Sequence, residues 1–225
     1  MSLLKSLVAA AAMLTLTGAA QAALVDRGGG MIYDTTRNIT WLADMNYAQT
    51  SGHTGVGVNA NGRMTWDAAM AWANGLVYGG FDNWRLPTVD PTDMSCTGGF
   101  GAGIGYNCTG GELSGLFVTD LGNKANESLL DQAGDTAEQI ANLALFRNVQ
   151  SGGYWSGTEY AQNPNVAWGF GTLGGFQIGD DKSSALYAVA VRPGDAGSSV
   201  PEPQTLALAL LALGATVVVR KRRPV

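Results

Sequence analysis

The sequence predicts an α+β domain with short helices, antiparallel β-strands and long loops. Strand-like segments occupy the beginning and the last third of the central region, and helical periodicity is confined to its middle. The 32 glycines separate these segments and predict many turns. Because strands lie at both ends of the region, we expect the terminal strands to meet in one sheet.

The first part of this region predicts three strands separated by two turns. Residues 28–30 are three consecutive glycines, and residues 35–38 form a polar turn, so the strands are expected at residues 24–27, 31–34 and 39–42. Residues 46–63 are polar and rich in Gly and Asn, and are predicted to be a long surface loop. This loop contains His53, the only histidine, which is expected to lie in solvent.

A helix is predicted to begin after Thr65, which is a suitable N-cap residue. Asp67 lies in its first turn, and Trp66, Met70 and Ala73 recur at helical spacing. After a glycine turn comes the segment of residues 84–88, Trp-Arg-Leu-Pro-Thr, which is expected to be buried. Its arginine then needs an acidic partner, for which Asp82 and Glu112 are the candidates.

The remaining elements follow from the same patterns. Short helices are predicted over residues 112–122 and 136–146, the second with Ile140 and Leu143 on its apolar face. Alternating apolar residues then predict strands at 154–160, 166–170, 176–178 and 185–192.

The first 22 residues have the pattern of a secretory signal peptide. Lys5 precedes an apolar run, and residues 20–22, Ala-Gln-Ala, form a small-x-small cleavage site. The mature chain is therefore expected to begin at Ala23. A buried N-terminal helix is the alternative interpretation.

Residues 198–225 form a three-part tail. Pro201, Glu202 and Pro203 precede an apolar run, which is followed by the basic residues 220–223. The tail closely resembles the PEP-CTERM sorting signal of Gram-negative bacteria. The resemblance implies transient anchoring in the inner membrane, recognition by an exosortase, and delivery to the cell surface or the extracellular matrix. An ordinary C-terminal anchor is the alternative.

Between these ends, residues 23–197 are predicted to form one domain with a single sizeable core. Eight of the 13 basic residues and all 18 acidic residues fall between Ala23 and Gln204, which gives that part a formal net charge of −10. This charge argues against binding nucleic acid or anionic polymers, and it permits binding of cations or neutral glycans.

Cys96 and Cys108 both lie in the exported part, where an oxidising compartment favours a disulfide. The alternative is a catalytic or metal-binding thiol. A zinc site is disfavoured because the chain has only these two cysteines and one histidine.

The chain carries four motifs in order, at residues 32–41, 66–69, 84–88 and 154–158, and Val-Ala-Val-Arg follows at 189–192. Together these motifs resemble the DUF1566 family, also known as the Lcl C-terminal domain. The resemblance covers roughly residues 26–192. It implies a compact C-type-lectin-like domain whose N- and C-terminal strands pair. Related formylglycine-generating enzymes use a cysteine pair near the end of the domain, and Cys96 and Cys108 do not match that position.

No catalytic residue is predicted. The sequence contains no nucleophile elbow, no His-x-x-x-His zinc motif and no phosphate-binding glycine loop. Acid–base chemistry would fall to paired carboxylates, as in a glycoside hydrolase, which is kept as an alternative.

A ligand site is predicted at Trp155, Trp168, Asp180 and Asp181. Indoles suit sugar faces, although both tryptophans also fit a buried core. The two aspartates offer oxygen ligands for Ca²⁺ but lack the spacing of a calcium loop, and a solvated turn is the alternative. Apart from Ca²⁺ at these two aspartates, no cofactor or metal is expected.

Three functions follow from these observations. The first is a non-enzymatic surface or matrix protein, sorted by exosortase, with a structural or adhesive role in a biofilm or exopolysaccharide. The second is a carbohydrate-binding, lectin-like module that recognises an extracellular polysaccharide or glycan. The third is the carboxylate-based hydrolase.

Overall fold

The C-terminal part of the domain pairs with its N-terminal strands, as the sequence predicts. The computed structural model describes residues 23–197, so the predicted signal peptide and the sorting tail, including Pro201, Glu202 and Pro203, lie outside the described residues. Strands β1 (Leu24–Asp26), β2 (Met31–Asp34) and β3 (Ile39–Leu42) form an antiparallel sheet with β9 (Val191–Pro193) in the order β1-β2-β3-β9. Trp41 of β3 lies opposite Val191 of β9.

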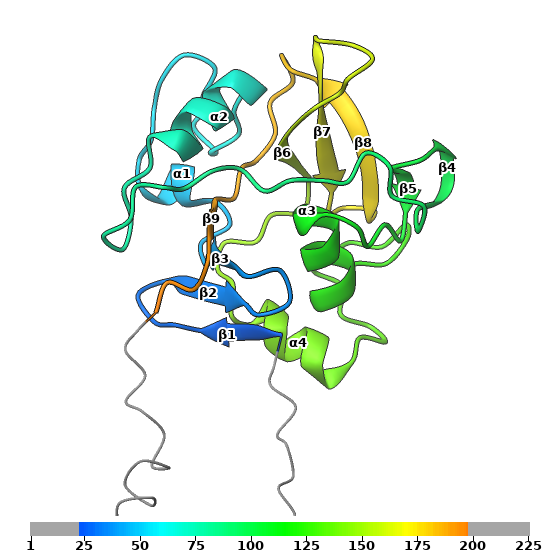
Figure 1. Ribbon diagram of the computed structural model, residues 1–225, viewed down its shortest axis with the longest axis horizontal. Helices are drawn as coiled ribbons and strands as arrows, with labels where there is room; N and C mark the ends of the chain where they lie inside the picture. Colours follow the sequence, from blue (N-terminus) through cyan, green and yellow to red (C-terminus); the bar gives the residue numbers. More distant parts are fainter. Residues whose placement is uncertain (1–22, 198–225) are drawn as a thin grey trace, which may run out of the picture.

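A second sheet holds the other strands (Figure 1). Its order is β4-β5-β8-β7-β6, and every neighbouring pair is antiparallel. The bounds are Thr97–Gly101 for β4, Ile104–Tyr106 for β5, Gly153–Glu159 for β6, Val166–Gly171 for β7 and Phe176–Asp181 for β8. These two sheets and the short helices confirm the predicted α+β class.

The helices connect and cover the sheets. They are α1 (Tyr47–Thr50), α2 (Trp66–Asn74), α3 (Glu112–Ser114), the π-helical turn η1 (Gly115–Asp120) and α4 (Ala137–Leu143). Helix α2 begins after Thr65 as predicted. Helix α4 begins with a reciprocal capping box, in which the Thr136 side chain accepts from the Gln139 backbone and the Gln139 side chain accepts in return.

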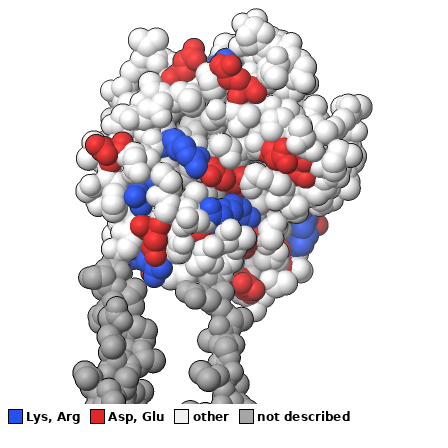
Figure 2. All heavy atoms as spheres, in the orientation of Figure 1, with Lys and Arg blue, Asp and Glu red and all other residues white. Residues whose placement is uncertain are grey.

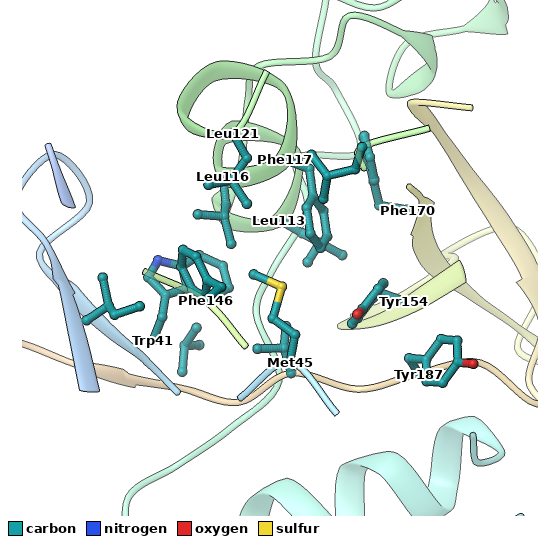
Figure 3. Close-up of a cluster of buried hydrophobic side chains, with 14 of the residues drawn as sticks. Trp41, Met45, Leu113, Leu116, Phe117, Leu121, Phe146, Tyr154, Phe170 and Tyr187 are labelled. Atoms are coloured by element: carbon teal, nitrogen blue, oxygen red, sulfur yellow. The ribbon is translucent and has the colours of Figure 1, made fainter. Parts of the chain in front are cut away.

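Two apolar clusters fill the interior. In the first, Phe117 of η1 stacks on Phe170 of β7 at 5.2 Å between ring centroids, and Tyr154 of β6 lies against the Phe117 ring (Figure 3). The second cluster packs the apolar face of α2 against β6 and the residues near 190, and it includes Trp66, Trp84 and Trp155. Trp84 is only 2% exposed, which confirms that the Trp-Arg-Leu-Pro segment is buried at its first residue.

The final segment of the domain does not form the continuous strand predicted for residues 185–192. Its backbone pairs in turn with several different segments: Leu186 with Met64, Tyr187 with β6, and Ala190 and Val191 with β3 and with Arg85. Only Val191–Pro193 is a strand, because no one neighbour runs beside the whole segment. Residues 185–192 therefore form a central segment whose backbone pairs with both sheets and with the loop before Pro87.

Three other predictions need correction. The segment of residues 46–63 is not entirely a surface loop, because it contains helix α1 and its residue Asn46 is buried. His53, in the same segment, is half-buried and not fully in solvent. Ile140 does not face the core and is 41% exposed, because α4 packs through Asn142 and Leu143. The segment between Cys96 and Cys108, for which no strand is predicted, forms the hairpin β4–β5.

Candidate functional site

An open groove of about 650 Å³ lies beside the start of α2 and the ends of β7 and β8. Its lining is mainly polar and includes Asp67 of α2, Asn165 before β7, and Asp181 and Lys182 at the end of β8. The backbone N–H of Trp66 donates to the carbonyl of Lys182 at 3.0 Å, and that of Lys182 donates to Asn165 at 2.8 Å. Three segments distant in sequence are therefore fixed around the groove.

The Lys182 side chain is held on both sides. Its ammonium lies 4.2 Å from the centroid of the Trp66 ring and 2.7 Å from a carboxylate oxygen of Glu159. A cation over an indole and beside a carboxylate is restrained in position while its remaining N–H groups can still donate. The groove therefore offers an ordered donor beside carboxylate and amide acceptors.

The two aspartates predicted as ligand residues form a turn at this groove. The Asp181 carboxylate accepts from the hydroxyl and backbone N–H of Ser183, and these hydrogen bonds lower the pKa of Asp181. Asp180 accepts from the Ser184 hydroxyl at 2.8 Å. Among residues 23–197, neither aspartate belongs to a group of three acidic, histidine or cysteine ligands. Asp181 lines the groove, and the pair has the geometry of the solvated turn that was the alternative prediction.

The two predicted ligand tryptophans lie in the core. Trp155 is 0% and Trp168 3% exposed. The Trp155 indole donates to the Met64 carbonyl at 2.8 Å, and Trp168 packs against Tyr160 with 5.1 Å between ring centroids. Neither indole presents a face on which a sugar could stack. The structure thus separates these residues from the groove and corrects the sequence-based grouping with Asp180 and Asp181.

Arg85 pairs with Glu112, one of its two predicted partners. Two parallel hydrogen bonds of 2.6 Å join the guanidinium to both carboxylate oxygens, and the backbone N–H of Thr88 donates to the same carboxylate at 2.8 Å. The hydrogen bonds to Glu112 raise the pKa of Arg85. Burial acts to raise the pKa of Glu112, but the bonds from Arg85 and Thr88 outweigh it and hold that pKa below its ordinary value. This pair ties the Trp-Arg-Leu-Pro segment to the start of α3.

A second charged cluster was not predicted. Arg37 donates to Asp34 at 2.6 Å and to Asp120 at 2.5 Å, and Asp34 also accepts from the indole of Trp41. Burial raises the pKa of Asp120, while Arg37 opposes that effect. Asp34 and Arg37 lie in one turn, but Asp120 comes from η1, so no periodic pattern in the sequence predicts the cluster.

The Arg37 cluster lies at a cavity of about 390 Å³. Asp120 lines this cavity together with Glu138 of α4 and Ala23, whereas the Asp34 side chain has no exposed surface. Of the two carboxylates in the cluster, only that of Asp120 is therefore accessible to a ligand. A buried carboxylate with a raised pKa at a cavity is a common property of functional sites.

The predicted disulfide between Cys96 and Cys108 is present. Asp93 lies beside it, and burial acts to raise the pKa of Asp93, but hydrogen bonds from Ser95 and the Gly110 backbone outweigh that effect and lower it. Both sulfur atoms are used in the disulfide, so neither can act as a thiolate ligand with Asp93. The group of Asp93 and the two cysteines stabilises the hairpin loop.

Comparison with known proteins identifies the tail. Residues 199–223 match the family described as the PEP-CTERM protein-sorting motif, which confirms the predicted sorting signal. Such signals are recognised by exosortase and indicate export, transient membrane anchoring and display at the cell surface. No curated protein and no solved structure matches the chain. The resemblance of the domain to the Lcl C-terminal and C-type-lectin-like folds stays a prediction.

Within residues 23–197, every helix is too short, or not apolar enough, to span a bilayer.

Proposed function

We propose that this chain is a non-enzymatic protein of the cell surface or extracellular matrix of a Gram-negative bacterium, with a structural or adhesive role. The sorting motif at residues 199–223 is the observation that carries the proposal. The proposed matrix is a biofilm or exopolysaccharide, in which a stable, passive domain is sufficient.

The arrangement of the domain supports display. Strands β1 and β9, which hold the two ends of the described chain, are the two outer strands of the small sheet, and the Arg27 guanidinium pairs with Asp195 at 2.6 Å to join the two ends. The hairpin β4–β5 and the loop between β6 and β7 lie away from that sheet (Figure 1). A domain tethered through its C-terminal tail would therefore present these loops to its surroundings.

The surface supports contact with uncharged partners. On the face in Figure 2, acidic and basic side chains are dispersed among uncharged residues. Phe100 at the β4–β5 hairpin is 95% exposed, and Met94 before it is 84% exposed. Single exposed apolar side chains are ordinary on a protein surface, so these two residues form no defined site and are compatible with contacts to uncharged partners.

The test is to produce the full chain in a Gram-negative host that contains an exosortase. A variant in which Pro201, Glu202 and Pro203 are all replaced by Ala should stay in the membrane fraction, whereas the wild type reaches the surface. Pro164→Ala, in the loop before β7, is the matched control and should be delivered normally. Equal surface delivery of the triple variant would refute the sorting step. Turnover of a polysaccharide that is lost in Asp120→Asn would instead favour the carboxylate hydrolase.

A second candidate function is carbohydrate binding at the groove beside Asp181 and Lys182. The ordered ammonium of Lys182 and the neighbouring amide and carboxylate groups favour it, because such groups hydrogen-bond sugar hydroxyls. A glycan array with and without Ca²⁺ tests this candidate. Saturable binding that is lost in Lys182→Ala and retained in Asp131→Asn, an exposed carboxylate outside the groove, would support it. Absence of saturable binding to any glycan would refute it.

A further inference from the structure

The cavity at the Arg37 cluster contains the residue with which the mature chain is predicted to begin. Ala23 lines this cavity with Asp120 and Glu138, and it is half-buried. Its carbonyl oxygen accepts a hydrogen bond of 2.8 Å from the backbone N–H of Thr35. The backbone of Ala23 is therefore fixed at the wall of the cavity.

The charges around the cavity do not balance. Three carboxylates, those of Asp34, Asp120 and Glu138, are close enough for their negative charges to repel one another. Arg37 is the cation that faces them. One nitrogen of Arg37, Nη1, already donates to both Asp34 and Asp120. Within residues 23–197, Glu138 has no ion-pair partner. The cluster therefore has a surplus of two negative charges.

The surplus has a consequence for Asp120. Burial raises the pKa of Asp120; Arg37 opposes this, but the charges of Asp34 and Glu138 raise the pKa further. A second cation at the cavity would favour the ionised form of Asp120. The remaining polar groups around the cavity, from Thr36, Thr119, Thr136, Gln139 and Asn142, are uncharged and do not supply one.

We propose that removal of the signal peptide after Ala22 creates this second cation, because the new α-ammonium of Ala23 pairs with the carboxylates of Asp120 and Glu138. Hydrolysis adds water across the Ala22–Ala23 peptide bond. The carboxylate stays with Ala22, and Ala23 keeps an amine that is protonated at neutral pH. Before cleavage the same nitrogen is an uncharged amide, so the cavity is completed only in the processed chain.

The inference goes beyond the proposed surface function and does not depend on it. It depends on the site of cleavage, and it predicts that processing stabilises the domain. The folded state should raise the pKa of the α-amino group. This stabilisation is then fully present below the ordinary pKa of an α-amino group, and it is lost as the pH rises through the raised folded-state value.

The test uses the protein as released from the cell surface. Mass spectrometry should show Ala23 as the first residue. Selective acetylation of its α-amine, which removes the charge, should lower the melting midpoint at pH 6 by roughly 2–4 °C. The effect of acetylation should be smaller both in Glu138→Gln and in Asp120→Asn, because each variant removes one of the two carboxylates. Glu127→Gln, which removes an exposed carboxylate that is not among the residues lining the cavity, is the matched control and should keep the full effect.

A titration followed by NMR provides a second measurement that does not depend on the stability of any variant. The pKa of the Ala23 α-amino group should be raised in the folded protein and return to its ordinary value in urea. An α-amino pKa that is the same in both states, equal melting midpoints with and without the acetyl group, or a mature chain that begins at another residue would each overturn the proposal.

Discussion

Replacement of Glu112 by Gln tests the ion pair that joins the Trp-Arg-Leu-Pro segment to α3. The variant keeps the size of the side chain but removes the charge that holds two hydrogen bonds of 2.6 Å from Arg85. Hydrogen bonds to a charged group contribute about 1.5–3 kcal/mol, and exposed pairs about 0.2–1 kcal/mol. The side chains of Arg85 and Glu112 are 36% and 15% exposed, so we expect an intermediate loss of about 1.5 kcal/mol.

Urea denaturation monitored by tryptophan fluorescence measures this loss, and the melting midpoint should fall by roughly 3–6 °C. Because the pKa of Glu112 is lowered in the folded state, its contribution is present above the ordinary glutamate pKa and is lost as the pH falls through the folded-state value. The difference between wild type and variant should therefore shrink in acid.

Glu127→Gln is the matched control for this experiment. Glu127 lies 3.8 Å from Lys124 and its side chain is 46% exposed, so its loss should change the free energy of unfolding by less than about 0.5 kcal/mol. If Glu112→Gln were no more destabilising than this control, or if its effect were unchanged at pH 3, the bidentate pair would not stabilise the segment as described.

Three further substitutions test other parts of the fold. Cys96→Ser should lower the free energy of unfolding in urea by about 2–3 kcal/mol under oxidising conditions, and addition of a reductant should abolish its difference from wild type. Gly111→Ala should destabilise by at least about 1 kcal/mol in thermal melts, because Gly111 has φ +80° and a Cβ atom there would lie 2.6 Å from the Asp90 backbone nitrogen; an unchanged midpoint would contradict the strained geometry. Phe100→Ser should leave the melting midpoint unchanged, since the ring is 95% exposed, and a large shift would mean that the hairpin packs against another surface.

Much of the fold follows from local sequence patterns. Strands β1 to β3 and helix α2 lie where glycine turns, alternation and the N-cap at Thr65 predict them. The burial of Trp84 and the need of Arg85 for an acidic partner also follow, because a bulky indole needs cover and a half-buried guanidinium needs a carboxylate; the choice of Glu112 over Asp82 does not.

Other features depend on long-range contacts that local patterns do not reveal. Residues 185–192 alternate like a strand, yet their partners are several separate segments, so only the last part forms a regular ladder. The burial of Trp155 results from the packing of α2 over β6, which alternation alone does not predict. The Arg37 cluster joins a turn to a π-helical residue from a distant part of the chain.

The central segment of residues 185–192 has a consequence for the timing of export. A protein that crosses a membrane N-terminus first delivers this segment after all the strands and helices that it bridges. The hydrogen bonds from Leu186 to Met64 and from Val191 to Arg85 therefore form only when almost the whole domain has emerged. Until then neither apolar cluster is complete, because both contain side chains of this segment.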